Sequence, residues 1–489
     1  MKILMATPEA VPYAKTGGLA DVVGAIPRHL RAAGHDVRVI MPLHRSARLR
    51  AKDALAPIGS VRVEVAGQPV EGRIFESKGP GDVTFYFVEA DRYFDREQLY
   101  GTAQGDYPDN AERFIFFSRS VLEALPAMGT RFDLIHLHDW QTALVPVYLR
   151  TLYADRAGAR EAATLLTIHN LAFQGVFWHW DMKLTGLDWS LFTPERLEFY
   201  GKINFLKGGI VFSDAINTVS RTYAKEIQTV EFGAGLEGVL RNRSQDVSGI
   251  LNGVDYDVWS PQTDKHIAAN FGAEDLSGKA ACKEALQKEF GLSIDPAVPL
   301  VGIVSRLDDG KGFDILASAM DEIMALDLEL VILGTGHERY HRLLADLAEQ
   351  YRGKLGVRLA FDNRVAHVIE AGADMFLMPS RYEPCGLNQL YSLRYGTVPI
   401  VRATGGLADT IQDANKGNGD ASTGFTFQDY TGPALAATVA RAVALFGDKR
   451  RWKKLVANGM AQDWSWARAA REYDALYQRV VEKRRASIG

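Results

Sequence analysis

The sequence predicts an α/β protein with two doubly wound parallel-sheet domains that face each other across a deep cleft. First, its 489 residues exceed what a single hydrophobic core usually covers. Second, short apolar runs bounded by turn residues alternate with amphipathic helical patterns from end to end. Third, the hexapeptide TGGLAD occurs at residues 16–21 and again at 404–409. Strand–helix alternation of this kind is typical of parallel sheets covered by helices on both faces.

The apolar runs predict strands in both halves of the chain. In the first half the runs span residues 2–7, 36–42, 83–90, 132–139, 163–170 and 213–220. In the second half they span residues 299–307, 328–336, 357–361, 373–380 and 397–404. Apolar positions at helical spacing separate several of them, for example at residues 111–125.

A domain boundary is predicted within residues 249–261, where a strand gives way to Asn-Gly and then to Trp259 and Pro261. We therefore expect an N-terminal Rossmann-like domain over residues 1–250 and a second one over residues 251–467. Such sheets bind ligands at the carboxyl ends of their strands, so two in tandem would hold a substrate between them. A dinucleotide cofactor is disfavoured, because the motif GTGHERY lacks the third glycine of the fingerprint.

Composition argues against several classes of partner. Lys plus Arg number 56 against 60 for Asp plus Glu, and a net charge of −4 gives no reason to expect nucleic acid or a membrane. The two cysteines, Cys282 and Cys385, exclude a disulfide scaffold and suit a reducing compartment. Because neither a signal peptide nor an apolar run of about 20 residues is present, we expect a cytoplasmic location.

Each copy of the hexapeptide lies between a predicted strand and a predicted helix. Gly17-Gly18 and Gly405-Gly406 therefore occupy strand-to-helix turns, where missing Cβ atoms let backbone N–H groups approach a ligand. An isolated Gly-Gly pair more often only closes a tight turn. Corresponding places in two domains favour ligand contact, so the substrate-binding candidates include both pairs, with Asp21 and Thr404 beside them.

Two cations follow a strand in the segment SRLDDGKGF. Arg306 lies at the strand end and Lys311 lies just before a helix. Together they suit a diphosphate, with Arg as a planar fork and Lys as a point charge. Taken alone, two basic residues near a strand end are more often solvated surface.

The segment SRYEPCGLNQLYSLRYG follows another strand. The proline after Glu383 restricts this residue to an extended conformation, at the tip of a loop. The amides of Gly386, Leu387 and Asn388 are then expected at a helix N-terminus, which suits an anion. Cys385 is a candidate for ligand contact rather than a nucleophile, because nothing nearby is suited to act as its base.

The segments HLHDWQ and TIHNLAFQG end adjacent strands at their carboxyl ends. His136 and His138 alternate along one strand and so point to the same face, but their spacing matches no structural zinc site and no cysteine is near. Asp139 and His169 are better placed to bind the hydroxyls of a polar ligand. The aromatic run FQGVFWHW could stack on sugar faces, although a buried core is the commoner place for such residues.

Together these segments resemble the bacterial glycogen synthase and plant starch synthase family, retaining glucosyltransferases of the glycosyltransferase-B architecture. The resemblance covers essentially the whole chain, and the order and spacing of its segments make it specific. The segments are KTGGLADVVGAIP, HLHDWQTALVPVYLR, TIHNLAFQGVF, FLKGGIVFSDAINTVS, GILNGVDYDVWSP, SRLDDGKGFDIL, SRYEPCGLNQLYSLRYG and ATGGLADTI.

The resemblance implies roles for the matching positions on the donor side. Lys15, with Gly17 and Gly18, belongs to an N-terminal loop that closes on the sugar nucleotide. Arg306 and Lys311 neutralise its distal phosphate. The backbone amides of Leu387 and Asn388 meet the diphosphate.

The resemblance also implies which groups hold the sugar. Glu383, Cys385 and Gly386 hold the glucosyl ring, and three further residues line the glucose pocket: Asp139, His169 and Asn252. The C-terminal helix, about residues 468–489, is implied to pack back on the first domain, on the glucan acceptor side.

Three departures from the commoner family pattern change no charged group. Gly310 precedes Lys311 where Gln is usual, Asn388 replaces a Thr, and Phe361 replaces a frequent Tyr. If the ring of Phe361 stacks on the nucleotide base, the stacking is kept but a hydroxyl contact is lost.

The implied reaction moves glucose from ADP-glucose to the non-reducing 4-hydroxyl of an α-1,4-glucan such as glycogen and keeps the α configuration. The catalytic candidates are Lys15, His169, Arg306, Lys311 and Glu383. Ordinary retaining glycosidases use two carboxylates about 5 Å apart, but here Tyr391 stands eight residues after Glu383. Glu383 is therefore expected to orient the sugar or support positive charge, while the departing phosphate takes the proton of the incoming hydroxyl.

No metal, pyridoxal phosphate or other cofactor is expected, because no Asp-x-Asp ends a strand among these motifs and cations already face the phosphate. Two alternatives stay open. A phosphorylase would need lysine-bound pyridoxal phosphate, and a glucan-binding protein without catalysis would not need Lys15, Arg306, Lys311 and Glu383 together. The preference for ADP-glucose over UDP-glucose rests on the resemblance alone, and the sequence does not indicate an oligomeric state.

Overall fold

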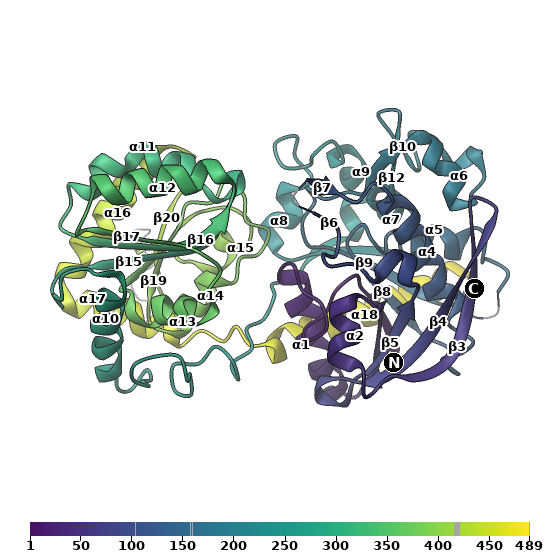
Figure 1. Cartoon of the computed structure of the whole chain (residues 1–489), viewed down its shortest axis with the longest axis horizontal. Coiled ribbons are helices and arrows are strands. Elements are labelled where there is room, and N and C mark those ends of the chain that lie inside the picture. The colour runs from purple at the N-terminus through teal and green to yellow at the C-terminus, as the bar shows by residue number, and fades with distance from the viewer. Residues whose placement is uncertain (103, 157, 159, 415–420, 489) are drawn as a thin grey trace. The chain divides into compact units, whose positions relative to one another are not determined.

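The computed structural model describes residues 1–489 apart from 103, 157, 159, 415–420 and 489. The chain divides into two compact units (Figure 1). Unit 1 is Met1–Gly253 with Trp466–Gly489, and unit 2 is Val254–Ser465. Each unit has its own parallel sheet with helices packed on it, which confirms the predicted fold class of two doubly wound α/β domains.

The described part of unit 1 is built on a nine-stranded sheet in the order β14-β13-β9-β8-β1-β2-β5-β4-β3. Its strands from β14 to β5 run parallel, and β4 and β3 add an antiparallel hairpin at one edge. The strands are β1 (Lys2–Ala6), β2 (Asp36–Pro42), β3 (Ala56–Val65), β4 (Gln68–Lys78), β5 (Thr84–Glu89), β8 (Leu134–His138), β9 (Ala163–Ile168), β13 (Ala215–Thr218) and β14 (Val247–Gly249).

The central strands read as unbroken apolar runs because helices cover both faces of the sheet. Every residue of β8 and β9 is buried. The helices of unit 1 are α1 (Gly18–Ala32), α2 (Arg45–Ala51), α3 (Asp91–Phe94), α4 (Asn110–Glu123), α5 (Leu144–Arg150), α6 (Met182–Thr185), α7 (Phe205–Phe212), α8 (Arg221–Glu226), α9 (Glu237–Asn242) and α18 (Trp466–Ile488). Short strands complete the unit: β6 (Gly101–Thr102), β7 (Gly105–Asp106), β10 (Val176–Trp178), β11 (Glu198–Phe199) and β12 (Lys202–Asn204).

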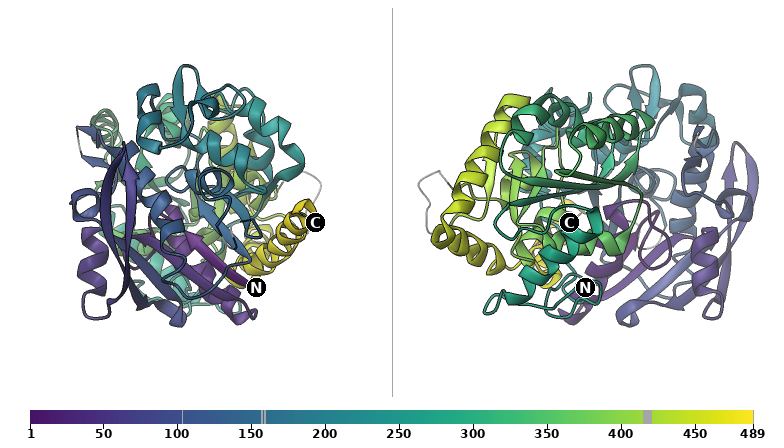
Figure 2. Two further views of the ribbon diagram at one scale, coloured as in Figure 1. Left: turned by 90° about the vertical axis from the view of Figure 1, so that its right-hand side faces the viewer. Right: turned by 60° about the vertical axis from the view of Figure 1, so that its left-hand side comes forward.

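The C-terminal helix α18 belongs to unit 1 although more than 200 residues of unit 2 precede it in the chain. It packs against α1 and β9 (yellow in Figures 1 and 2). Its Trp466, Tyr473 and Tyr477 are buried in the same core cluster as Ile3 and Leu165. The helix therefore supplies part of the hydrophobic core on one face of the sheet.

The sheet of unit 2 is fully parallel in the order β17-β16-β15-β18-β19-β20. The strands are β15 (Leu300–Leu307), β16 (Glu329–Gly336), β17 (Leu355–Leu359), β18 (Met375–Met378), β19 (Val398–Arg402) and β20 (Phe425–Phe427). The helices are α10 (Ser277–Phe290), α11 (Phe313–Met324), α12 (Glu338–Gln350), α13 (Asn363–Gly372), α14 (Asn388–Arg394), α15 (Gly405–Thr410), α16 (Gly432–Gly447) and α17 (Lys449–Met460).

Both sheets reverse their strand order at one point. In unit 1 the reversal falls between β1 and β8, and in unit 2 it falls between β15 and β18. A crevice forms outside the carboxyl ends of the strands at such a switch point, and doubly wound proteins bind ligands there. No helix in the described part of the chain is long and apolar enough to span a membrane.

Candidate functional site

A hollow of about 180 Å³ opens at the switch point of unit 2, outside the carboxyl ends of β15 and β18. The strands supply its walls, and the loop before α14 closes one side. Six of the predicted site residues line it, together with Ser380. The lining includes Arg306, Lys311, Ser380, Glu383, Gly386, Leu387 and Asn388.

Lys311 and Glu383 form an ion pair at this hollow. The Lys311 ammonium donates to Glu383 Oε2 at 2.7 Å, and Ser380 Oγ donates to the same oxygen at 3.0 Å. The Lys311 side chain is 21% exposed and that of Glu383 only 9%. Glu383 lies in the loop between β18 and α14, and its carboxylate points inward, where it accepts from these two donors.

The second hexapeptide packs against the backbone of the loop that carries this carboxylate. Gly406 N–H donates to the carbonyl oxygens of Glu383 and Pro384, at 3.1 and 3.2 Å. A Cβ at Gly405 would lie 1.9 Å from the Glu383 carbonyl oxygen, and one at Gly406 would lie 2.0 Å from that of Cys385. These glycines are therefore required by the close packing of two backbone segments. Their predicted contact with substrate stays a prediction, together with that of Thr404.

The other predicted groups of unit 2 differ in how freely they face the hollow. The Arg306 side chain is 68% exposed, with Asp308 at 3.5 Å. The side chain of Asn388 has a structural role, since its Nδ2 donates to the carbonyl of Val304 at 2.7 Å. Gly386 has φ of +71° and Leu387 is the N-cap of α14, so this turn directs backbone toward the hollow. Cys385 is buried.

The first hexapeptide differs from the second although its letters are the same. Gly17 has extended backbone, with φ of −148°, and α1 begins at Gly18. A Cβ at Gly17 would meet no heavy atom of the described residues within 4 Å. Beside it, the Lys15 ammonium donates to Asp21 Oδ1 at 2.7 Å, and the Lys15 side chain is 51% exposed. A side chain at Gly17 would therefore have room, whereas one at Gly405 would overlap the backbone of Glu383.

At the switch point of unit 1, Asp139 and His169 are joined. Asp139 follows β8 in a left-handed conformation, with φ of +56°, and its carboxylate accepts the backbone N–H of His169 at 2.7 Å. Burial raises the pKa of Asp139 to about 7 and lowers that of His169 to about 3. His169 is therefore neutral near pH 7 and suited to bind a hydroxyl. Asn252 is buried at the end of the unit.

The two histidines of β8 serve the interior of unit 1. Their rings do share a face, with centroids 4.2 Å apart, as the alternation predicted. His136 bonds Tyr477 of α18 and Thr167 through its two ring nitrogens, and His138 Nδ1 lies 3.0 Å from His169 Nε2. In the described residues no three His, Cys, Asp or Glu side chains gather as a metal site. Independence from metal stays a prediction.

Two residues that were not selected from the sequence contact the predicted site residues or their neighbours: Ser380 bonds Glu383, and Glu9 bonds Thr16, which lies between Lys15 and Gly17. From the sequence, His138 was considered only as a metal ligand, and its Nδ1 lies 3.0 Å from His169 Nε2. The available signal for Glu9 was an acid three residues after the end of β1, shortly before the first hexapeptide. Ser380 and His138 carried no such signal, because only the folded chain shows what their side chains face.

Comparison with known proteins finds a matching glycosyltransferase family model in each unit. Residues 2–242 match the family model of the starch synthase catalytic domain, and residues 287–456 match that of glycosyl transferases group 1. The chain is 51% identical to the glycogen synthase of Koribacter versatilis, with 99% of each chain covered. It is 48% identical to the glycogen synthase of Syntrophotalea carbinolica, again with 99% of each covered.

A solved structure also covers both units. The catalytic domain of starch synthase IV from Arabidopsis thaliana, bound to ADP and acarbose, is 34% identical and matches with a TM-score of 0.87. The match covers 98% of this chain and 99% of the plant chain. The chain therefore belongs to the glycogen synthase and starch synthase family, the retaining glycosyltransferases that its sequence motifs resembled.

Proposed function

We propose that this enzyme transfers glucose from ADP-glucose to the non-reducing 4-hydroxyl of an α-1,4-glucan such as glycogen, with retention of the α configuration. The observation that carries the proposal is the hollow of unit 2, where Arg306, Lys311 and Glu383 surround one space at a switch point. A diphosphate needs the two cations, and a sugar cation needs the carboxylate. The ADP bound to the plant starch synthase supports the choice of nucleotide.

In this proposal Arg306 and Lys311 bind the distal phosphate of the donor. When the bond from sugar C1 to the phosphate oxygen breaks, its electron pair stays on that oxygen. Fixed cations stabilise this growing charge without reorganising, and removing one such group commonly costs about 3 kcal/mol. Lys311 Nζ already donates to Glu383 at 2.7 Å, so one ammonium would link the carboxylate to the leaving phosphate.

Glu383 has a role that needs no covalent bond. Its carboxylate is nearly enclosed and held by Lys311 and Ser380, which leaves it fixed close to the ring of a bound sugar. There it would stabilise the positive charge that develops at C1. The glucan 4-hydroxyl would attack from the face that the phosphate leaves, forming the new C1–O4 bond and passing its proton to the phosphate oxygen.

Groups of unit 1 are suited to the same kind of ligand. Lys15 is half-exposed beside the open Gly17, which suits an approach to phosphate. His169 is neutral and Asp139 lies against it, which suits binding of sugar hydroxyls. We propose that these groups act on the same donor molecule as Arg306 and Lys311, with no metal and no pyridoxal phosphate.

The test is incubation of the purified enzyme with glycogen and radiolabelled ADP-glucose or UDP-glucose, with labelled glucan as the readout. Incorporation from ADP-glucose is expected, and it should persist in EDTA. Incorporation from neither nucleotide would overturn the proposed function, and a preference for UDP-glucose would overturn the donor. A pyridoxal absorbance band in the purified protein would instead support the phosphorylase alternative.

A further inference from the structure

Glu9 is a buried carboxylate with no cation to balance it. It lies in the segment between β1 and α1, at the switch point of unit 1, and is 4% exposed. Among the described residues, no Lys, Arg or His lies within ion-pair distance of it. Burying an unpaired carboxylate is unfavourable, so the hydrogen bonds it receives must serve a purpose or offset its cost.

Those hydrogen bonds all come from the loop that leads into α1. Glu9 Oε2 accepts a short hydrogen bond from the backbone N–H of Thr16. Thr16 Oγ1 lies 3.0 Å from both carboxylate oxygens. The backbone N–H of Gly17 also stabilises the charged form of Glu9. One side chain therefore holds two consecutive residues of the segment KTGG.

This anchoring replaces the usual helix cap. α1 has Gly17 at its N-cap position, with no side-chain hydrogen bond to the first turn. A residue without a side chain cannot accept the N–H groups that helices leave unpaired at their start. Glu9 reaches the chain just before the helix and fixes it there, while Gly17 stays bare and open.

Lys15 is the residue whose position depends on this anchor. It directly precedes Thr16, and its half-exposed ammonium is held at 2.7 Å from Asp21 on the first turn of α1. Glu9 fixes Thr16 and the helix fixes Asp21, so the Lys15 side chain is held in one direction. Without the hydrogen bonds to Glu9, the loop and the Lys15 side chain would be free to move.

We propose that Glu9 is a positioning residue for the transfer reaction, which holds Thr16 and Gly17 so that Lys15 is preorganised for the donor phosphate. The inference rests on the proposed function, because it assigns Glu9 no role without that of Lys15. Preorganised groups act on a transition state at no cost of reorganisation, and misplacing one by about 1 Å costs up to about a hundredfold in rate.

The surroundings of Glu9 make its charge sensitive to pH. Asp139 faces it from the end of β8, Asp21 from α1, and Tyr100 from the loop before β6. Arg113 of α4 acts on Tyr100, and Lys15 pairs with Asp21. Burial raises the pKa of Glu9 to about 7, with Asp21 adding to the rise. Near neutral pH the carboxylate is thus close to losing the charge with which it holds Thr16.

The substitution Glu9→Gln tests the inference, because an amide keeps the shape but not the charge. It should lower kcat/KM for ADP-glucose by roughly tenfold to a hundredfold while the melting temperature does not fall. The wild type should lose activity as the pH falls through about 7, and that step should be smaller in Glu9→Gln, in which Asp139 still titrates over the same range. Thr16→Val should lower kcat/KM and Thr16→Ser should restore it, since serine keeps the hydroxyl.

Glu329→Gln is the matched control. Glu329 is also a buried carboxylate with a raised pKa, but it lies in unit 2 and bonds Gln287. Its substitution should leave the pH profile of transfer unchanged. A step that becomes equally small in Glu329→Gln would overturn its assignment to Glu9.

Hydrogen exchange of the segment 9–20 gives a readout that does not need activity. At one pH, Glu9→Gln should exchange this segment faster than the wild type, with no change at residues 380–390. Unchanged exchange would overturn the anchoring itself. Faster exchange with unaltered kcat/KM would overturn the positioning role. A wild type that transfers from neither nucleotide, with the exchange difference intact, would instead overturn the proposed function and spare the anchor.

Discussion

Lys311 and Glu383 are 72 positions apart in sequence, and their side chains form an ion pair with each other. The ammonium has one carboxylate at 2.7 Å, and the carboxylate is almost wholly enclosed. A buried pair of this kind is costly to break from one side, because the remaining charge is left without its partner. The sequence showed that both residues were candidates, but it could not show that they form a pair.

Lys311→Ala should lower turnover with ADP-glucose by about a hundredfold, since one fixed cation is lost from the leaving phosphate. Initial rates at saturating glycogen measure this effect. Lys288→Ala is the control, because Lys288 forms only an exposed pair with Glu284 and should leave turnover unchanged. Near-normal turnover in Lys311→Ala would mean that another group covers the phosphate.

The two glycines of the repeated hexapeptide should respond differently to alanine. Gly405 has φ of +45° and its Cβ would overlap the Glu383 carbonyl, so Gly405→Ala should cost at least about 1–3 kcal/mol from backbone strain alone. Gly17 is extended and open, so Gly17→Ala should leave stability nearly unchanged. If Gly17 approaches the donor as proposed, that variant loses activity all the same.

Urea unfolding and initial rates on the same two preparations check this prediction. Each variant is the control for the other, because the letters around both glycines are identical. Equal loss of stability in the two would contradict the assignment of the second pair to backbone packing.

At the scale of elements, the strands buried on both faces were predictable and the exposed ones were not. β8 and β9 are unbroken apolar runs, which is what helices on both faces of a parallel sheet require. The hairpin of β3 and β4 was missed, since its alternating exposure carries no long apolar run. Strands of two or three residues, such as β10, contain too little sequence to show a period.

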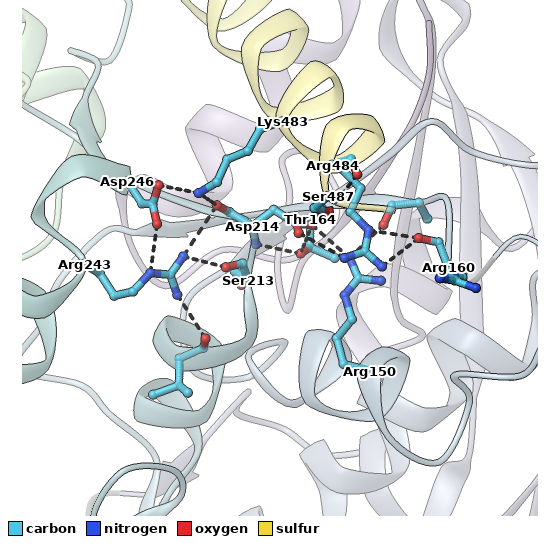
Figure 3. A network of polar contacts seen from close by, with 12 residues as sticks. Arg150, Arg160, Thr164, Ser213, Asp214, Arg243, Asp246, Lys483, Arg484 and Ser487 are labelled. Atoms are coloured by element: carbon cyan, nitrogen blue, oxygen red, sulfur yellow. Dashed lines mark hydrogen bonds and ion pairs between the residues drawn. The ribbon is translucent and has the colours of Figure 1, made fainter. Parts of the chain in front are cut away.

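The attachment of α18 involves a network of charges that only the fold brings together (Figure 3). Asp214 accepts from Arg150 and Thr164 at 2.8 Å each, and Lys483 of α18 donates to the Asp214 carbonyl. Arg484 donates twice to the carbonyl of Arg160, at 2.9 and 2.7 Å. The last turns of the helix are thereby tied to loops between the strands.

Two neighbouring arginines of α18 offer a matched test of this network. The Arg484 side chain is 14% exposed, whereas that of Arg485 is 68% exposed and lies 3.6 Å from Asp133. Arg484→Ala should lower the free energy of unfolding by about 1–3 kcal/mol, because a largely buried guanidinium with two hydrogen bonds and an ion pair to Asp214 is lost. Arg485→Ala should change it by less than about 0.5 kcal/mol. Urea titrations distinguish the two, and similar losses would show that the helix is held by its apolar face alone.

At the scale of the whole molecule, the two units carry different buried titratable groups. Burial lowers the pKa values of His44, His136 and His169 to about 3 and lowers that of His138 well below its ordinary value. Burial also raises the pKa values of Glu9 and Asp139 to about 7. All of these lie in unit 1. In unit 2, burial raises the pKa of Glu370 to about 8.

The signs of these shifts oppose each other on acidification. Below the ordinary histidine pKa of about 6.5, the unfolded chain protonates the four histidines and the folded chain does not, so stability is lost as the pH falls. Glu9 and Asp139 act in reverse, since the folded chain binds their protons first. The four histidines outnumber the two carboxylates, so unit 1 takes up protons when it unfolds. For each proton of this difference, its free energy of unfolding falls by about 1.4 kcal/mol per pH unit of acidification. Glu370 makes unit 2 gain stability over the same range.

Acidification from about pH 7 to about pH 5 should therefore weaken unit 1 before unit 2. Hydrogen exchange read on peptides of each unit measures the two separately. His44→Gln should remove one of the four histidine contributions and make the loss in unit 1 less steep, because the amide can still donate to the carbonyl of Pro8 that His44 contacts at 3.0 Å. Unit 2 unfolding first, or an unchanged slope in His44→Gln, would mean that the buried histidines do not stay neutral.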